Sequence, residues 1–159
     1  MAKAIAINIE NCISCGLCEQ ACSFEKEREF NPSLSGIRVE RNEGKEIYIP
    51  IFCQQCEKAV CMKKCPTNAL RKNNNTGVVE WFKADCLTGC DKCLAACPFG
   101  AIRLVRGKVI KCDQCNGNPA CVLICPKGTL TFVDEKDWGK REKNALLRRY
   151  KELLVSLKS

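Results

Sequence analysis

Histidine is absent from this chain of 159 residues. Its absence excludes Rieske clusters, histidine-ligated haem and zinc fingers that combine cysteine with histidine. It also removes the side chain that most often serves as a general base. Neither G-x-G-x-x-G nor G-x-x-x-x-G-K-S/T occurs, so the sequence predicts no dinucleotide site and no P-loop. We assign no catalytic residue and expect no catalysis by this chain alone.

Long apolar runs are missing as well. No stretch of 18 apolar residues exists, so we expect no membrane-spanning helix. The first residues, MAKAIAINIENC, contain a single lysine and no twin arginine, which is not typical of a signal peptide. We therefore expect a cytoplasmic protein, unless the chain is exported while bound to a partner that carries a signal.

Cysteine, in contrast, is abundant, and its sixteen copies fall into four quartets. The quartets are Cys12, Cys15, Cys18, Cys22; Cys53, Cys56, Cys61, Cys65; Cys86, Cys90, Cys93, Cys97; and Cys112, Cys115, Cys121, Cys125. Each ends in C-x3-C, and Pro66, Pro98 and Pro126 follow the last three quartets. A run of C-x2-C-x2-C-x3-C-P is the ligand pattern of [4Fe–4S] cubanes in bacterial ferredoxins, where the fourth cysteine serves a different cluster from the first three. Sixteen thiolates are enough for four such clusters.

The spacing suits this chemistry because cubane iron is soft and binds sulfur. Three cysteines spaced two residues apart can bind three corners of one cube from a single loop, whose backbone N–H groups point at the sulfides. The fourth cysteine lies on the next helical turn and can reach a second cube. The third quartet has one extra residue between Cys86 and Cys90, which Gly89 can absorb because glycine tolerates a positive φ.

Two alternatives use the same thiols. All-cysteine zinc sites usually combine two C-x2-C pairs across a longer linker, whereas each quartet here crowds into 11 to 14 residues. Disulfides are not expected without evidence of export. A zinc-bound nucleic-acid module is the alternative that metal analysis would decide.

The formal net charge of +8 at first suggests nucleic acid or another acidic partner. That figure counts the cysteines as neutral. An oxidised cubane with four thiolates carries about −2, so four cubanes would offset the whole excess. We interpret the lysines and arginines as counter-charges to buried anionic groups, and we expect no nucleic-acid partner.

The apolar content is low once cysteine is set aside. It falls from 46% of the chain to about a third without the sixteen cysteines. We therefore expect the clusters to form part of the core. The apo-protein should be poorly folded, because metal binding and folding are coupled.

Internal repetition predicts an α+β fold. The repeated segments are CPTNALRK at 65–72, CPFGAIRL at 97–104 and CPKGTLTF at 125–132. Each reads as Cys-Pro, a short turn and an apolar strand, and partner strands are predicted at 4–9, 78–82 and 108–111. A two-cluster ferredoxin contains a pair of such units, so four units predict two ferredoxin-like modules.

We expect a single polyferredoxin domain over 1–134, with a β-hairpin insert at 36–52, and a C-terminal amphipathic helix over 135–159. The helix is predicted because apolar residues recur there at helical spacing. These residues are Leu146, Leu147, Tyr150, Leu153, Leu154 and Leu157. The sequence leaves open whether this helix packs on the chain's own modules or docks a partner.

With these motifs the chain resembles the four-cluster iron–sulfur subunits of molybdopterin and tungstopterin oxidoreductases. The likeness runs from Asn11 to about Phe132 and includes the quartet order, the hairpin insert, YIPIFCQQCEKAVCMKKCPTNAL and CPFGAI. It implies that the first quartet pairs with the fourth and the second with the third. The implied ligand sets are Cys12, Cys15, Cys18 and Cys125; Cys112, Cys115, Cys121 and Cys22; Cys53, Cys56, Cys61 and Cys97; and Cys86, Cys90, Cys93 and Cys65.

Among these subunits the short chain is most similar to the small electron-transfer subunits of tungsten-dependent aldehyde oxidoreductases from anaerobes. The resemblance implies a large catalytic subunit that contains a tungsten- or molybdenum-pterin. It also implies ferredoxin or another acceptor, with electrons relayed along four clusters between the two proteins. The alternatives are a subunit of a formate dehydrogenase or hydrogenase complex and a free-standing polyferredoxin.

Overall fold

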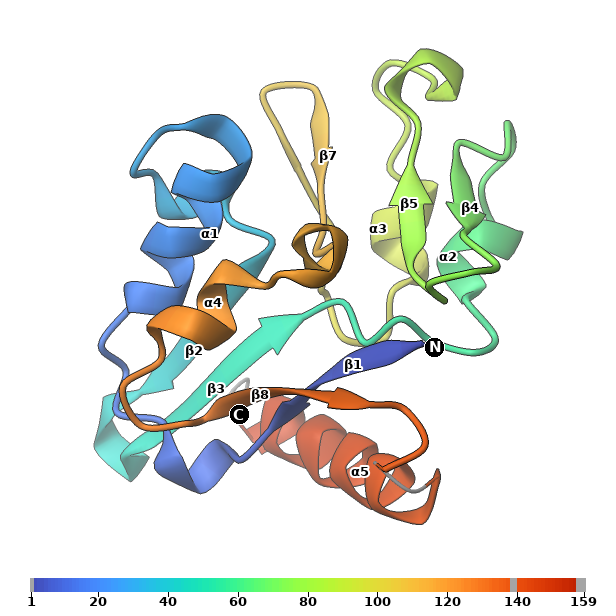
Figure 1. Cartoon of the computed structure of the whole chain (residues 1–159). Coiled ribbons are helices and arrows are strands. Elements are labelled where there is room, and N and C mark those ends of the chain that lie inside the picture. The colour runs from blue at the N-terminus through green and yellow to red at the C-terminus, as the bar shows by residue number, and fades with distance from the viewer. Residues whose placement is uncertain (1, 138–139, 157–159) are drawn as a thin grey trace.

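Short antiparallel strand pairs form the frame of the molecule. The computed structural model describes residues 2–137 and 140–156, and its strands form two-stranded sheets. The strands are β1 (Lys3–Ile7), β2 (Ile37–Asn42), β3 (Ile47–Phe52), β4 (Leu70–Lys72), β5 (Val79–Trp81), β6 (Arg103–Val105), β7 (Lys108–Ile110) and β8 (Leu130–Asp134). β1 pairs with β8, whereas β2–β3, β4–β5 and β6–β7 are local hairpins (Figure 1). The strands predicted after the three Cys-Pro turns are confirmed as β4, β6 and β8, and their predicted partners as β5, β7 and β1.

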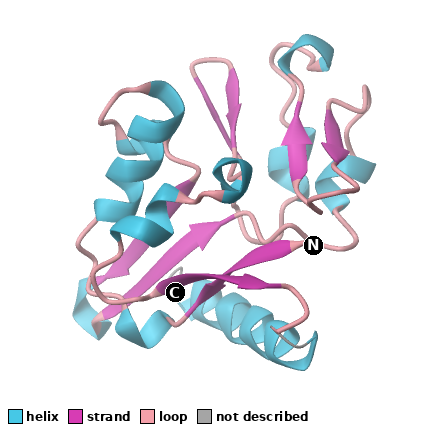
Figure 2. Cartoon of the chain, in the orientation of Figure 1, coloured by secondary structure: helices cyan, strands magenta, loops and turns pink. Residues whose placement is uncertain are grey.

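Short helices alternate with these strands (Figure 2). Within the described residues the α-helices are α1 (Leu17–Glu27), α2 (Val60–Lys63), α3 (Lys92–Ala96), α4 (Ala120–Ile124) and α5 (Lys140–Ser156). The 3-10 helices there are η1 (Ile9–Asn11), η2 (Pro32–Leu34), η3 (Glu43–Lys45), η4 (Lys83–Asp85) and η5 (Gln114–Gly117). The third cysteine of each quartet lies in one of the first four α-helices. This mixture of antiparallel strands and few helices confirms the predicted α+β class.

Three hydrophobic clusters make up the core of the described residues. The first contains cysteines of the first and fourth quartets, among them Cys18, Cys22 and Cys121, together with aliphatic residues of β1 and β2. The second contains Cys93, with Cys61 and other partly buried cysteines of the second and third quartets at its edge. In Figure 1 the helices α1 and α4 lie on one side of the molecule, and α2 and α3 lie on the other. Thiols therefore occupy core positions that larger apolar side chains fill in other proteins.

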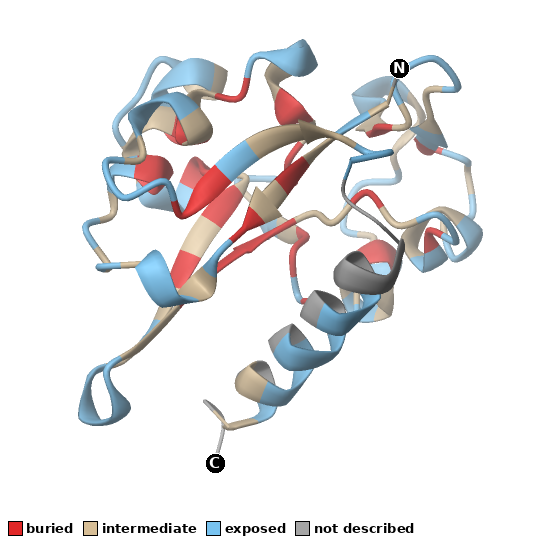
Figure 3. Cartoon of the chain, turned by 60° about the horizontal axis from the view of Figure 1, so that its bottom comes forward, coloured by how far each residue is buried: buried red, intermediate tan, exposed pale blue. Residues whose placement is uncertain are grey.

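The hairpin β2–β3 joins the two halves of the core. Ile37 and Val39 of β2, with Phe52 of β3, belong to the first cluster. Ile49 and Ile51 of β3 point to the opposite face, where they form the third cluster with phenylalanine and alanine from the Cys-Pro turn after the third quartet. Buried segments accordingly concentrate on these central strands (Figure 3). The hairpin lies within the segment 36–52 where the sequence predicts one.

The C-terminal helix α5 packs on the chain itself. Leu153 packs against the third cluster. Arg149 Nη2 donates a 2.8 Å hydrogen bond to Glu10 Oε1, and Lys151 Nζ lies 5.7 Å from the ring centre of Phe99. Of the two arrangements that the sequence leaves open, packing on the chain is therefore observed. The side chains of Leu146, Leu147, Tyr150 and Leu154, and the whole of Leu157, lie outside the described residues.

Within residues 2–137 and 140–156, no helix combines the length and the apolar character that a bilayer span requires.

Candidate metal centres

Site A contains the first three cysteines of the first quartet and the last cysteine of the fourth. Cys12, Cys15, Cys18 and Cys125 line one small cavity, whose walls are otherwise mostly aliphatic. Burial, the carboxylate of Glu19 and the neighbouring thiols raise the pKa of Cys18 to about 12. Burial also raises the pKa of Cys12, and the charges of Cys15 and Cys125 add to this effect. Because Cys15 is exposed, site A lies close to the molecular surface.

Site B is the set that the resemblance implies for the fourth quartet and the last cysteine of the first, namely Cys112, Cys115, Cys121 and Cys22. The helices α1 and α4, which carry Cys22 and Cys121, pack against each other. Burial raises the pKa of Cys121, and the charges of Cys112, Cys22, Cys115 and Cys18 raise it further. Burial also raises the pKa of Cys112 to about 12.

Site C is the set that the resemblance implies for the second quartet and the last cysteine of the third, namely Cys53, Cys56, Cys61 and Cys97. Burial raises the pKa of Cys61 to about 11, and the charges of Cys53 and Cys97 act in the same direction. Cys56 and Cys97 both pack against the third hydrophobic cluster.

Site D contains the remaining four thiols. Cys65, Cys86, Cys90 and Cys93 line a second small cavity, together with Trp81, Leu87 and Val109. Burial raises the pKa of Cys93, as do the charges of Cys86 and Cys90. Gly89 has φ of 76°, and a Cβ there would meet nothing within 4 Å. The extra residue of the third quartet is therefore taken up at a glycine, as the sequence predicts.

A common turn follows the last cysteine of the second, third and fourth quartets. The third residue after the cysteine has a positive φ: 54° at Asn68, 57° at Gly100 and 59° at Gly128. This left-handed residue directs the next N–H back toward the sulfur. Ala69 N donates to Cys65 Sγ at 3.2 Å, and Ala101 N donates to Cys97 Sγ at 3.4 Å.

The equivalent turn is missing after the first quartet, because α1 continues from Cys22 to Glu27. Ser23 occupies the position of the proline and is fully buried. Its Oγ donates to the carbonyl of Gln20 at 3.0 Å and accepts from Asn31 N at 3.1 Å. The N–H that reaches Cys22 Sγ comes instead from Gly36, at 3.2 Å. The chain thus retains the N–H···S contact with a different local structure.

Charged side chains that the sequence did not single out surround these sites. The buried Glu19 accepts from Arg41 Nη2 at 2.7 Å and from Val39 N at 3.0 Å. Arg41 also donates to Ser14 Oγ at 2.8 Å, which ties the hairpin to the loop of site A. Lys26 forms an ion pair with Asp113 beside site B. Composition predicts counter-charges as a group, but the partners depend on the tertiary fold.

The donor atoms of the four sites are those that the implied iron–sulfur group requires. All sixteen cysteines carry free thiols, which are soft donors suited to iron–sulfur chemistry. Among the residues that the structure describes, no group of three or more cysteine, aspartate or glutamate side chains is arranged to hold a single metal ion. A zinc ion requires four sulfurs at about 2.3 Å, whereas each thiolate of a cubane binds its own iron. Sites made of thiols alone supply the donors that the second arrangement takes.

Comparison with known proteins gives matches to two families. Residues 45–135 match the 4Fe-4S dicluster domain family, and residues 9–25 match a 4Fe-4S binding domain family.

Three similar proteins cover most of the chain. The chain is 44% identical, over 124 residues, to the polyferredoxin-like subunit of the aliphatic sulfonate oxidoreductase of Pyrococcus furiosus, covering 76% of this chain and 70% of that protein. It is 41% identical, over 147 residues, to an uncharacterized ferredoxin of Methanocaldococcus jannaschii, covering 91% and 81%. It is 30% identical, over 177 residues, to the electron transport protein HydN of Escherichia coli, covering 92% and 99%.

Proposed function

Since the chain belongs to the 4Fe-4S dicluster domain family, we propose that it is an electron-transfer subunit of an oxidoreductase complex. Four [4Fe–4S] clusters, held by the sixteen cysteines, would each supply a one-electron redox centre. The observation that carries this proposal is the grouping of thiols at sites A and D, where three cysteines of one quartet line a small cavity with the last cysteine of another. The similarity to a polyferredoxin-like subunit and to an electron transport protein supports it.

We assign one cluster to each of sites A, B, C and D. Sites A and B exchange the last cysteines of the first and fourth quartets, and sites C and D exchange those of the second and third. This exchange defines two interleaved ferredoxin-like modules within 1–134, with the hairpin 36–52 as an insert and 135–159 as the C-terminal segment. The fully buried cysteines support the assignment, because those of the first cluster belong to the first and fourth quartets and that of the second cluster belongs to the third.

The four sites are proposed to form a row in the order A, B, C, D. Cys18 of site A and Cys121 of site B interact through their charges. Cys53 of site C acts in the same way on Cys112 of site B. The second hydrophobic cluster contains Cys61 of site C and Cys93 of site D. Sites A and D are therefore the ends of the row at which partner proteins would exchange electrons.

The partner at one end is proposed to be a large subunit with a tungsten- or molybdenum-pterin that oxidises an aldehyde or a similar small substrate. The other partner is ferredoxin or another soluble acceptor, and the complex is cytoplasmic. The resemblance of residues 11–132 to the iron–sulfur subunits of molybdopterin and tungstopterin oxidoreductases supports the pterin partner. The similarity to a subunit of an aliphatic sulfonate oxidoreductase favours a second candidate, in which the partner acts on a sulfonate.

Metal analysis tests the cluster assignment. The protein is purified without oxygen, and iron, acid-labile sulfide and zinc are measured per chain. We expect a brown protein with about sixteen iron and sixteen sulfide. A colourless protein that contains zinc would contradict the assignment and favour the zinc alternative.

Isolation of the native complex tests the role as a subunit. A tagged chain should co-purify with a large protein that contains tungsten or molybdenum and a pterin. Recovery of the brown chain as a lone monomer would favour the free-standing polyferredoxin. Recovery with a formate dehydrogenase or a hydrogenase would favour those complexes. A variant without residues 140–159 shows whether α5 is required for assembly.

A further inference from the structure

A buried lysine lies between sites B and C. Lys111 is 9% exposed and directly precedes Cys112 in the chain. Its Nζ donates a 2.8 Å hydrogen bond to the carbonyl oxygen of Cys112 and another to the carbonyl oxygen of Val79. In the described part of the chain no carboxylate forms an ion pair with Lys111. Its positive charge is therefore held in the interior by neutral groups.

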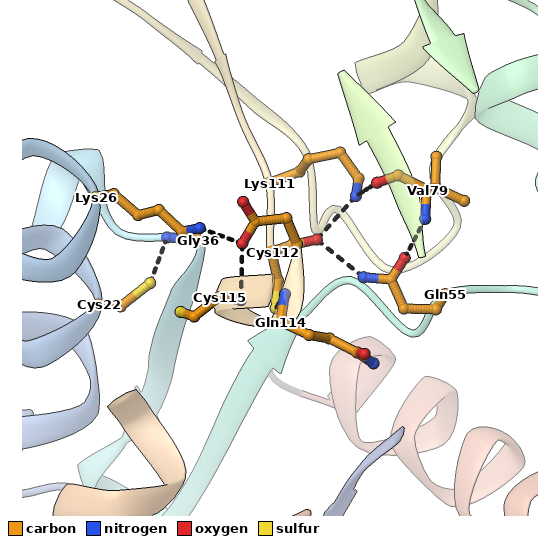
Figure 4. Close-up of polar contacts among 10 residues, drawn as sticks. Cys22, Lys26, Gly36, Gln55, Val79, Lys111, Cys112, Gln114 and Cys115 are labelled. Atoms are coloured by element: carbon orange, nitrogen blue, oxygen red, sulfur yellow. Dashed lines mark hydrogen bonds and ion pairs between the residues drawn. The ribbon is translucent and has the colours of Figure 1, made fainter. Parts of the chain in front are cut away.

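Gln55 completes a closed network with this lysine. Its Nε2 donates to the carbonyl oxygen of Cys112 at 2.9 Å, and its Oε1 accepts from the N–H of Val79 at 2.8 Å. Figure 4 shows Lys111 and Gln55 converging on the same two backbone segments. Gln55 lies between Cys53 and Cys56 in the loop of site C, whereas Cys112 belongs to site B. The network thus connects both loops at the point where the two halves of the core meet.

The position of Lys111 gives it electrostatic contact with both sites. Its charge favours the thiolate form of Cys61 in site C and of Cys112 in site B, although burial has the larger effect on each thiol. Two other cations beside the sites have carboxylate partners. Arg41 pairs with Glu19 near site A, and Lys26 pairs with Asp113 near site B. Lys111 therefore contributes charge that no neighbouring carboxylate offsets.

We propose that Lys111 raises the reduction potentials of the two inner clusters, at sites B and C, relative to the outer two, and that Gln55 holds it in place. The inference rests on the proposed function, because it assumes that clusters occupy the four sites. One-electron reduction adds one negative charge to a cluster, and a nearby buried cation stabilises the reduced form. Lys111 is a positioning residue in this sense, because it contacts the ligand loops and not a substrate.

The test measures the potentials of the four couples in holoprotein prepared without oxygen. Redox titrations followed by electron paramagnetic resonance give the potentials, and contact-shifted NMR signals of the cysteine β-protons assign each couple to its ligands. In Lys111→Met, the ratio of reduced to oxidised cluster at a fixed applied potential should fall about tenfold at sites B and C. This is the effect of one charge over roughly 10 Å at an effective dielectric constant near 20. A tenfold change corresponds to about 59 mV for a one-electron couple.

Matched variants separate charge from structure. Lys111→Arg retains the charge and should restore both potentials. Gln55→Met removes hydrogen bonds without removing charge, and should change the potentials less than Lys111→Met. Lys108→Gln removes a partly exposed lysine from the same segment as Lys111. Lys108 pairs with Glu27, and its replacement should leave all four potentials unchanged. If Lys111→Met does not fold, Gln55→Glu places a negative charge beside Lys111 and should lower the same two potentials.

The outcomes distinguish the inference from the proposed function. Lower potentials at sites B and C alone support it. Unchanged potentials, or an equal change in all four couples, overturn the role of Lys111 and leave the four clusters in place. Wild-type protein without iron–sulfur absorbance would instead overturn the proposed function itself.

Discussion

The N–H of Ala69 donates a hydrogen bond to the Sγ of Cys65 across 3.2 Å. Burial raises the pKa of Cys65, but hydrogen bonds from Thr67, Leu70 and Ala69 outweigh it, so the pKa is lowered. The same balance lowers the pKa of Cys125, the last cysteine of the fourth quartet. Donors aimed at a sulfur stabilise its thiolate form. The turn after the last cysteine therefore favours the thiolate form, which is the form that binds metals.

The first prediction concerns the left-handed residue of that turn. Asn68 has φ of 54°, where asparagine is tolerated and alanine is strained. Asn68→Ala should lower the stability of the holoprotein by about 1 kcal/mol, which corresponds to a fall in Tm of about 2–4 °C. Asn68→Gly should have a smaller effect, because Gly100 and Gly128 occupy this position in the other turns. Equal Tm values for the two variants, measured without oxygen, would contradict the strain argument.

The repeated turns show what could be predicted from the sequence. The Cys-Pro segments predict strands because apolar residues follow each turn, and Leu70, Ile102 and Leu130 are buried there. Gly89 could be recognised because glycine is the residue suited to a positive φ. Local pattern and covalent geometry are sufficient for such features.

Other parts of the sites could not be predicted in this way. The contact of Gly36 with Cys22 depends on how the chain returns after α1, and the pair Arg41–Glu19 depends on the position of the hairpin. Lys111 has no signal beyond its place before Cys112. These features arise from tertiary packing between segments far apart in sequence, about which composition and spacing carry little information.

The second prediction concerns a close backbone approach at Gly36. A Cβ at this position would lie 3.0 Å from Cys112 N and 3.1 Å from Cys112 Cα, and backbone atoms cannot move away as a flexible side chain can. Gly36→Ala should therefore destabilise the holoprotein by about 1–3 kcal/mol. Site B should be affected first, because Gly36 also donates to Cys22 Sγ. Thermal unfolding and iron content of the purified variant measure the two effects.

Gly44→Ala is the matched control for this prediction. A Cβ at Gly44 would have only the side chain of Asn42 nearby, at 3.7 Å, and Gly44 is not among the residues with a positive φ. We expect its stability to stay within about 0.5 kcal/mol of the wild type. If Gly36→Ala were equally well tolerated, the close approach would have no energetic consequence.

The third prediction concerns the pH dependence of cluster retention. Burial raises the pKa of Cys18 and Cys112 to about 12 and that of Cys61 to about 11, so these thiols bind protons whenever the iron is lost. Protons therefore compete with iron at every pH below these values. Holoprotein mixed with a chelator should bleach more slowly at pH 8.5 than at pH 6.5, as visible absorbance would show. Bleaching at the same rate at both values would contradict this competition.

The stability of the apo-protein should depend on pH in the opposite direction and should fall as the pH rises. A raised pKa in the folded state means that the neutral thiols favour the fold below pH 9, the ordinary range of a thiol. This contribution is lost as the pH rises toward 11 to 12. Any residual structure of the reduced apo-protein, followed by circular dichroism, should therefore decrease between pH 9 and 12. Structure that increases over this range would contradict the direction of these pKa shifts.

The last prediction tests the exchange of ligands between quartets. Cys97 ends the third quartet, yet it lies with Cys61 and Cys53 of the second. Cys97→Ala should perturb the cluster at site C, with a loss of up to about four iron atoms per chain, and should leave the ligands of site D intact. Cys65→Ala is the reciprocal variant, because Cys65 shares a cavity with Cys93. It should perturb site D and spare site C. Contact-shifted NMR signals of the cysteine β-protons identify which cluster changes. Perturbation of site D alone in Cys97→Ala would mean that each quartet holds its own cluster.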